Sequence, residues 1–303
     1  MEWLSDFFFV HDTFVRTMLL DIVLAYSLYI TFRAGMWSLA QAGVMAISAY
    51  VVGILVLDHD WSLIAALPVG VVVATVAGLL ILLPVLRLQG VYLAIATIAF
   101  VELVRVAAVN LEVTGGPAGL AGLPSDITIL QLLAVVVVAV AAVGALNRSR
   151  MGEATGLHAT SPLLAQALGV NTRRLRLGLL AIAFVIGAVG AAFGTHVFRV
   201  VGPGDYGFAT VVELLTYVIV GGTASLAGPI VGVLVLSLPA ELVPQLGEYK
   251  PLFDGIVLLL AILFFPGGLT SPSQYRGPRG LGRHLSGWLG ALRSRGRVGE
   301  AAE

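Results

Sequence analysis

The sequence contains no cysteine and one lysine among its 303 residues, and only 11% of its residues are charged. Without cysteine, the chain cannot form disulfides, thiolate metal sites or a thiol nucleophile. Lys250 follows Tyr249 rather than glycine, so the chain lacks the Gly-Lys-Ser/Thr of a phosphate-binding P-loop. The five histidines are scattered without an HExxH motif, and Ser225 lies in GTASLAG rather than GxSxG. We therefore expect neither a catalytic site nor a metal site in this chain.

Apolar residues dominate the sequence instead. They make up 58% of it, and the mean hydropathy is +0.99. These values exceed those of soluble globular domains. They predict an all-α, polytopic integral membrane protein with about eight to ten crossings, since each crossing takes about 20 residues. Nine apolar runs are candidate crossings: residues 17–32, 36–57, 62–83, 88–109, 128–147, 177–196, 210–222, 229–246 and 252–266.

Arginine is distributed unevenly along the chain. Five of the sixteen arginines lie in a polar stretch, residues 148–176, and six more follow the last apolar run. Cytoplasmic loops of membrane proteins carry an excess of Lys and Arg, so we place both segments in the cytoplasm. Alternation of the nine crossings then puts the N-terminus outside. Thirteen basic residues fall inside and four outside, namely Arg16, Arg105, Arg199 and Lys250.

The same interpretation divides the chain into three parts. Residues 1–16 lack the basic start of a cleavable signal peptide and contain several aromatic residues, so they are predicted to form an interfacial segment. Residues 17–270 are predicted to form the transmembrane domain, with a cytoplasmic loop at 148–176. Residues 271–303 are predicted to form a cytoplasmic tail rich in Arg and Gly.

Two glycine-rich segments adjoin apolar runs: TGGPAGLAGLP (114–124) and GGTASLAGP (221–229). Each has two interpretations. It is either a broken helix, whose freed backbone groups line a permeation path, or a tight turn at a helix end. A Val-Glu-Leu tripeptide precedes each segment on helices predicted to run in opposite directions, which suggests an inverted repeat. The spacings Gly190–Gly194 and Gly228–Gly232 favour close helix packing over a ligand role.

Ionisable residues within the apolar runs are few: Asp21, Glu102, Arg105, Glu213, Glu241 and Asp254. Because a charge in the bilayer is costly, each should face the bundle interior, a partner or water. Glu102 and Arg105 are three residues apart on one helix, which favours a structural ion pair over a solute contact. Glu213 has no partner nearby in the sequence, which favours a polar group lining a path. The other three lie near predicted helix ends, where we expect them to be solvated.

Six segments occur in an order that resembles a known family. They are SLAQAGVMAISAY (38–50), LPVLRLQGVYLAIATIAFVELVRV (83–106), TGGPAGLAGLP (114–124), ALGVNTRRLRL (167–177), VIVGGTASLAGPIVG (218–232) and LFFPGGL (263–269). Together they resemble the permease subunit of high-affinity branched-chain amino acid ABC importers, of the LivM-like type. The run RLQGVYLAIATIAFVE indicates that subunit rather than its usual heteromeric partner. The resemblance covers roughly residues 25–270.

The resemblance implies a multi-subunit importer in the bacterial inner membrane. Its other parts would be a second, LivH-like permease subunit, two cytoplasmic ATPase subunits that bind ATP-Mg, and an extracytoplasmic solute-binding protein. Membrane lipid is an implied partner and nucleic acid is not, and this chain would need no cofactor of its own. Transport would proceed by alternating access driven by ATP hydrolysis in the partners. The candidates for the translocation path are Gln41, Tyr92, Thr97, Glu102, Gly115, Gly116, Glu213, Gly221 and Gly222.

The resemblance also implies that the 148–176 loop carries a coupling helix that docks on an ATPase subunit. The residues assigned to this role are Gly152, Glu153, Ala154, Ala165, Leu168, Gly169 and Asn171. Between Glu153 and Ala165 the chain reads ATGLHATSPLL, where the family carries arginines and acidic residues. Because Gly156 and Pro162 are poor helix formers, we expect a shorter or kinked element.

Three alternative functions are compatible with the residues. A permease of the same family could import urea or short amides. An ion-coupled secondary transporter would require Glu102 or Glu213 to titrate. A receptor or scaffold would carry no solute at all.

Overall fold

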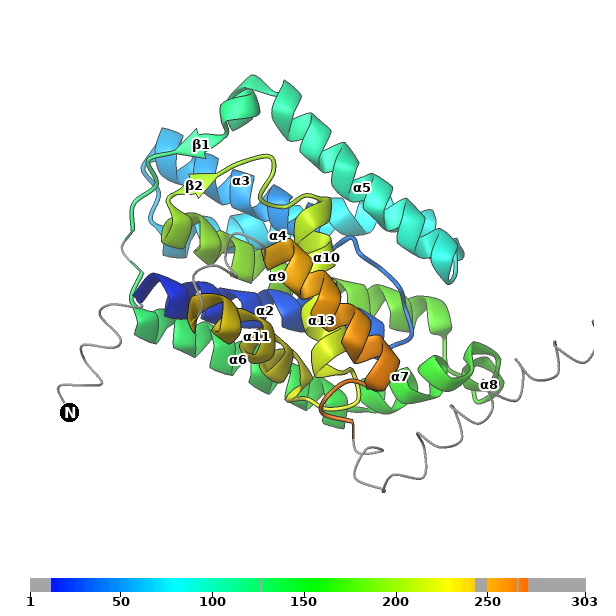
Figure 1. Ribbon diagram of the computed structural model, residues 1–303. Helices are drawn as coiled ribbons and strands as arrows, with labels where there is room; N and C mark the ends of the chain where they lie inside the picture. Colours follow the sequence, from blue (N-terminus) through cyan, green and yellow to red (C-terminus); the bar gives the residue numbers. More distant parts are fainter. Residues whose placement is uncertain (1–11, 126, 243–249, 266, 272–303) are drawn as a thin grey trace, which may run out of the picture. The chain divides into compact units, whose positions relative to one another are not determined.

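The computed structural model describes residues 12–125, 127–242, 250–265 and 267–271. This part of the chain is almost entirely helical, as predicted, with one pair of very short strands (Figure 1). The elements are α2 (Asp12–Arg33), α3 (Gln41–His59), α4 (Leu63–Leu82), η1 (Val85–Arg87), α5 (Val91–Asn110), η2 (Glu112–Thr114), η3 (Gly116–Ala118), β1 (Leu120–Ala121), α6 (Ile129–Arg148), α7 (Arg150–Thr160), α8 (Pro162–Ala167), α9 (Thr172–Phe198), β2 (Val200–Val201), α10 (Phe208–Gly221), α11 (Gly228–Leu242) and α13 (Lys250–Phe264).

Each of the nine apolar runs coincides with a helix. Six of these helices, α2 to α6 and α9, are long and apolar enough to cross a membrane. The other three, α10, α11 and α13, have 14 or 15 residues each. At 1.5 Å per residue they rise by only about 21–23 Å, less than the roughly 30 Å of a bilayer core. The prediction of a polytopic all-α protein is confirmed, and these three apolar runs form shorter helices than the others.

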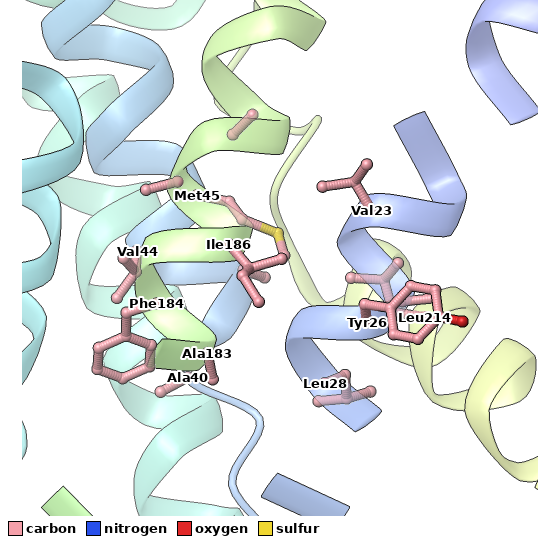
Figure 2. Close-up of a cluster of buried hydrophobic side chains, with 14 of the residues drawn as sticks. Val23, Tyr26, Leu28, Ala40, Val44, Met45, Ala183, Phe184, Ile186 and Leu214 are labelled. Atoms are coloured by element: carbon pink, nitrogen blue, oxygen red, sulfur yellow. The ribbon is translucent and has the colours of Figure 1, made fainter. Parts of the chain in front are cut away.

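The core lies where α2, α3 and α9 pack together. These three helices are more than half buried, whereas α4, α5 and α6 are less than a third buried. Small residues on α9 allow the close approach, because a Cβ on Gly190 would lie 2.8 Å from Leu24 and one on Gly187 would lie 3.0 Å from Met45. Figure 2 shows part of this core, in which side chains of α2, α3, α9 and α10 gather.

Glycines also bring α10 and α11 into backbone contact. A Cβ on Gly232 would lie 1.9 Å from the carbonyl oxygen of Tyr217, and one on Gly221 would lie 1.9 Å from that of Gly228. The predicted packing role of Gly228 and Gly232 is therefore confirmed. The 221–229 segment forms a turn within the bundle, where the Tyr26 hydroxyl of α2 lies 2.5 Å from the Leu226 carbonyl oxygen. The ends of this segment, Gly221, Gly222 and Gly228, are buried, whereas its middle is partly exposed.

The 114–124 segment has a different structure. After α5 ends it forms two 3₁₀ turns and then β1, which pairs antiparallel with β2 in the register Leu120↔Val201. Gly119 has φ +70°, and a Cβ there would lie 2.2 Å from the Val201 carbonyl oxygen, so the pairing requires glycine. Of its two interpretations, the turn beyond a helix end is the one observed.

The connecting loops gather at two opposite ends of the bundle. One end holds the β1–β2 pair, together with Arg16 of α2, whose guanidinium donates to the Ile127 carbonyl oxygen. The other end holds α7 and α8 (Figure 1). There, Ala159 lies against Gly35 and the Arg176 guanidinium donates to the Leu88 carbonyl oxygen over 2.9 Å. This division agrees with the alternation expected for the first six crossings.

Two expectations concern the chain ends. Residues 1–11 of the predicted interfacial segment lie outside the described residues, and Asp12 already belongs to α2. Residues 272–303 of the predicted tail also lie outside the described residues.

Candidate translocation site

A hollow of about 360 Å³ lies beside α10. Its walls come from the end of α2, the α2–α3 connection, the first turn of α5, the second half of α10 and the turn that follows α13. Most of its side chains are apolar. The lining residues are Phe32, Trp37, Leu39, Ala94, Leu215, Val218, Ile219, Gly222, Thr223, Gly267 and Gly268. A pocket of this size, with apolar walls and some exposed backbone, suits a small ligand that has an apolar side chain.

Local contacts fix the shape of this hollow. The rings of Phe32 and Trp37 stack with their centroids 6.3 Å apart. The Leu39 amide donates to the Thr97 hydroxyl over 3.0 Å, which attaches the α2–α3 connection to α5. Gly222 has φ +95°, and a Cβ there would lie 2.7 Å from the Gly267 carbonyl oxygen. A side chain at position 222 would therefore close the hollow and strain the backbone.

Four predicted path residues lie in or near the hollow. Gly222 lines it, and Gly221 precedes it at the end of α10. Thr97 is fully buried and supports the wall through Leu39. Gln41 is also buried, and its side-chain amide donates to the Thr31 hydroxyl over 3.0 Å.

The other path candidates lie elsewhere. Tyr92 is 74% exposed on the outer face of α5. Glu102 lies just past the middle of that helix, and its ion pair with Arg105 is confirmed at 2.7 Å. Gly115 and Gly116 belong to the 3₁₀ turns after α5. The structure therefore does not gather the nine candidates into one site.

Glu213 belongs to a cluster of charged groups on the other side of α10. It forms an ion pair with Lys250 at the start of α13. The Tyr217 hydroxyl lies 2.8 Å from Glu213 Oε1 and 3.3 Å from Asp21 Oδ2 of α2. Asp254 lies one turn after Lys250, is 9% exposed, and its Oδ1 has no hydrogen-bond partner among the described residues. We call Asp21, Glu213, Tyr217, Lys250 and Asp254 the charged cluster.

The charged cluster corrects two expectations. Asp254 was expected to be solvated, which is wrong, because it is 9% exposed on α13, which packs on α10. Asp21 is half-buried on α2, next to Tyr217. Glu213 was expected to have no partner nearby in the sequence and to line a path as a polar group. Its partner Lys250 lies 37 residues away, and Tyr217 lies one helical turn away. The i, i+4 spacing of Glu213 and Tyr217 was the sequence signal that could have revealed the second contact.

The polar 148–176 loop folds into two short helices. Ser149 caps α7, and Ser161 caps α8 through the Leu164 amide at 3.3 Å. The chain bends between Thr160 and Pro162, which starts α8, a position where proline is well tolerated. The predicted shorter, kinked element is therefore observed. The exposed apolar residues of this loop are Leu157 (37%), Leu163 (78%), Leu164 (47%) and Leu168 (62%).

The residues assigned to coupling divide into supporting and exposed groups. Gly152 is buried against the end of α6, where a Cβ would lie 2.4 Å from the Leu146 carbonyl oxygen, and Ala165 is fully buried. Asn171 caps α9 through the Arg174 amide at 3.0 Å. The remaining four form the surface or its edge: Glu153, Leu168 and Gly169 are exposed, and Ala154 is half-buried.

His158 on α7 is 8% exposed. Burial, and then the charge of nearby Arg176, lowers the pKa of His158 below its usual value of 6.5. The imidazole is therefore neutral in the folded loop at neutral pH. Among the residues that the structure describes, no three His, Asp or Glu side chains come close enough to hold a metal ion.

These features define a polytopic all-α membrane protein with an apolar hollow and a folded polar loop at one end. Its family follows from sequence comparison. The model of the family "Branched-chain amino acid transport system / permease component" matches residues 11–265, so the chain belongs to that family. The resemblance stated from the motifs is thereby confirmed.

Individual relatives agree with this assignment. The chain is 29% identical over 275 residues to the high-affinity branched-chain amino acid transport system permease protein LivM of Escherichia coli, an alignment that covers 78% of this chain and 64% of the relative. It is 32% identical over 127 residues to LivH of the same organism, covering 40% of each chain. It is 29% identical over 130 residues to BraD of Pseudomonas aeruginosa, covering 41% of each. The alignment thus spans less than two thirds of LivM, and no solved structure matches the chain.

Proposed function

We propose that this chain is a permease subunit of an ABC importer for branched-chain amino acids in the bacterial inner membrane. Its partners would be a LivH-like permease, two ATPase subunits that bind ATP-Mg, and a solute-binding protein. The C-terminus and the α7–α8 loop would face the cytoplasm, as the arginine distribution favours. Family membership and the similarity to both LivM and LivH support this proposal.

The apolar lining of the hollow is the observation that carries the choice of solute. Leu215, Val218 and Ile219 present aliphatic side chains to it, and the rings of Phe32 and Trp37 lie at its edge. A leucine, isoleucine or valine side chain would be desolvated there at a gain of about 1.5–3 kcal/mol, whereas urea and short amides have little apolar surface to bury. Backbone groups near Gly222 and Gly267 would meet the polar end of the solute. Branched-chain amino acids therefore fit this lining better than the smaller alternatives.

The α7–α8 loop supports a contact with a partner. A polar loop that folds into two capped helices, yet exposes Leu163, Leu164 and Leu168, has an apolar surface without cover from the described residues. Exposed leucines of this kind are typical of docking elements. Binding of this surface to an ATPase subunit would transmit ATP-driven movement through α7 and the start of α9 to the bundle.

Reconstitution tests the proposal and separates it from an ion-coupled transporter. Proteoliposomes that contain this chain with its permease, ATPase and binding-protein partners should take up labelled leucine only when ATP is present. Proteoliposomes with this chain alone should show no uptake under a proton or sodium gradient. Gradient-driven uptake by the purified chain would contradict the ABC proposal, and ATP-driven uptake of urea in preference to leucine would contradict the solute assignment.

A further inference from the structure

A second hollow, of about 230 Å³, lies where α4 and η1 meet the start of α9. Three of its lining residues are arginines: Arg87 of η1, and Arg173 and Arg176 of the first turns of α9. Thr172 lines it too, at the first residue of α9, so the positive end of the helix dipole adds to the arginine charges. We call this the basic hollow.

Arg176 shows that the basic hollow is built into the fold. It is 8% exposed, and one of its terminal nitrogens donates to the Leu88 carbonyl oxygen over 2.9 Å. Its Nε, however, is buried and has no hydrogen-bond partner among the described residues. A buried donor that lines a hollow and lacks an acceptor destabilises the fold. An acceptor bound in the hollow would remove that destabilisation.

No acidic side chain among the described residues neutralises the charges of the basic hollow. The ion pairs observed within the described ranges join Asp12 to Arg16, Glu102 to Arg105 and Glu213 to Lys250, and none includes Arg87, Arg173 or Arg176. His158, the titratable group of α7 that Arg176 influences, is neutral in the folded loop and supplies no negative charge. Guanidinium groups grouped in this way bind phosphate oxygens through several hydrogen bonds at once.

The position of the hollow indicates where a phosphate would come from. α4 carries exposed apolar side chains along its length, including Ile64, Val72 and Leu80, so this helix faces lipid acyl chains. The hollow lies at the end of α4, where Leu83 and Leu86 form its apolar walls. The end of a membrane-spanning helix lies at the same depth in the bilayer as the lipid headgroups. Basic pockets between helix ends are suited to anionic headgroups.

We propose that the basic hollow binds the phosphate group of an anionic membrane lipid, with Arg87, Arg173 and Arg176 as its donors. The lipid would join η1 to the start of α9, next to the α7–α8 loop. Lipid binding does not depend on which solute the protein carries. It can therefore be tested separately from the proposed transport function.

Native mass spectrometry of the purified full-length chain tests this proposal. The chain would be titrated with phosphatidylglycerol and, in parallel, with phosphatidylcholine. The test variants are Arg87→Gln, Arg173→Gln and the double variant, since both side chains are exposed and neither makes an ion pair in the described structure. The matched control is Arg174→Gln, which removes a neighbouring exposed arginine that does not line the hollow.

The wild type should retain one phosphatidylglycerol more tightly than phosphatidylcholine. Each test variant should weaken that binding about fivefold, since one arginine near an anionic headgroup contributes about 1 kcal/mol. The double variant should weaken it further, and Arg174→Gln should leave it nearly unchanged. Equal binding by all variants, or an equal loss in the Arg174→Gln control, would overturn the proposal.

Two further measurements distinguish an anionic lipid from other ligands of the basic hollow. Inorganic phosphate, added to lipid-free protein in detergent, should stabilise the wild type little. Stabilisation as strong as that by phosphatidylglycerol, lost in the same variants, would assign the hollow to soluble phosphate instead of lipid. Variants that keep their lipid but no longer bind the ATPase subunits would assign it to an acidic group of a partner protein, which also overturns the lipid proposal.

Discussion

Lys250, at the first residue of α13, forms an ion pair with Glu213 of α10 and thereby joins two short helices across a gap of 37 residues in the sequence. Both side chains are about one third exposed, at 33% and 32%, and Tyr217 contacts both of them. The pair lies beside Asp21 and Asp254, so the charged cluster holds three carboxylates and one ammonium group. Loss of Lys250 would therefore leave the carboxylates of the cluster without an opposing charge, whereas loss of Glu213 would break the ion pair and leave Lys250 with Asp21 and Asp254.

This pair predicts unequal effects of two similar substitutions. Glu213→Gln should destabilise the protein by about 2 kcal/mol, less than the 3–5 kcal/mol of a fully buried pair because the side chains are partly exposed. Glu102→Gln should have a smaller effect, because its partner Arg105 is 41% exposed and its long side chain can reach water. Thermal unfolding and leucine uptake would be measured for both. Equal transport by Glu213→Gln and the wild type would remove Glu213 from any path.

A double-mutant cycle distinguishes the pair itself from general disruption. Lys250→Met combined with Glu213→Gln removes both charges, so the loss of stability in the double variant should be smaller than the sum of the losses in the two single variants. Additive losses would show that the two side chains do not interact energetically.

The apolar hollow predicts a steric effect at Ala94, a half-buried lining residue in the first turn of α5. Ala94→Phe would place a ring in the space expected for the solute and should lower leucine uptake at least about tenfold, while insertion stays normal. Ala99→Phe is the control, since Ala99 is an exposed residue of the same helix that does not line the hollow. Uptake by Ala94→Phe at the wild-type rate would show that the solute does not pass this hollow.

The exposed leucines of α8 predict a loss of coupling. Leu163→Asp should weaken ATPase binding by about 2 kcal/mol, as loss of a central apolar anchor does, and should reduce ATP-driven uptake accordingly. Thr160→Asp places the same charge at an exposed polar position of α7 and should have little effect. Co-purification of the ATPase subunits measures the outcome. Unchanged binding by Leu163→Asp would show that the ATPase subunits contact another part of the chain.

His158 predicts a loss of stability on acidification. Since the folded loop favours the neutral imidazole, the pKa of His158 is below 6.5 in the folded state and near 6.5 when unfolded. Above pH 6.5 both states are neutral and stability is constant. As the pH falls below that value, the unfolded state binds the proton first, so stability decreases until the folded pKa is reached. Between about pH 7.5 and 5.5 the unfolding temperature should therefore fall more in the wild type than in His158→Gln. His59→Gln, at an exposed histidine, should keep the wild-type dependence.

Side-chain labelling tests the orientation. Because the chain has no cysteine, a thiol introduced by substitution is the only one present. Ser161→Cys, between α7 and α8, should react with a membrane-impermeant reagent only from the cytoplasm. Ala118→Cys, in the exposed turn after α5, should react only from outside. The reverse pattern would invert the topology.

The helices could be predicted from this sequence. In a membrane, an apolar run has no water to bind its backbone groups, so it must form its hydrogen bonds within itself, as a helix does. The packing role of Gly190 and Gly194 could also be predicted, since their spacing places both on one helix face. The pairing of Lys250 with Glu213 could not, because it depends on how α13 packs on α10. Nor could the apolar hollow, whose walls come from five separate segments and whose shape depends on the turn at Gly222.

The glycine contacts between α10 and α11 have a consequence for motion. Backbones that touch at Gly221, Gly228 and Gly232 have no room to slide, and the amides of Leu269 and Thr270 also donate to the carbonyl oxygens of Val220 and Gly221. If access to the hollow alternates, α10, α11 and the segment after α13 must travel together as one rigid body. The bending would then fall on the 202–207 connection ahead of α10, which contains three glycines. Stiffening this hinge, for example by Gly204→Ala, would slow the movement and leave the moving body intact.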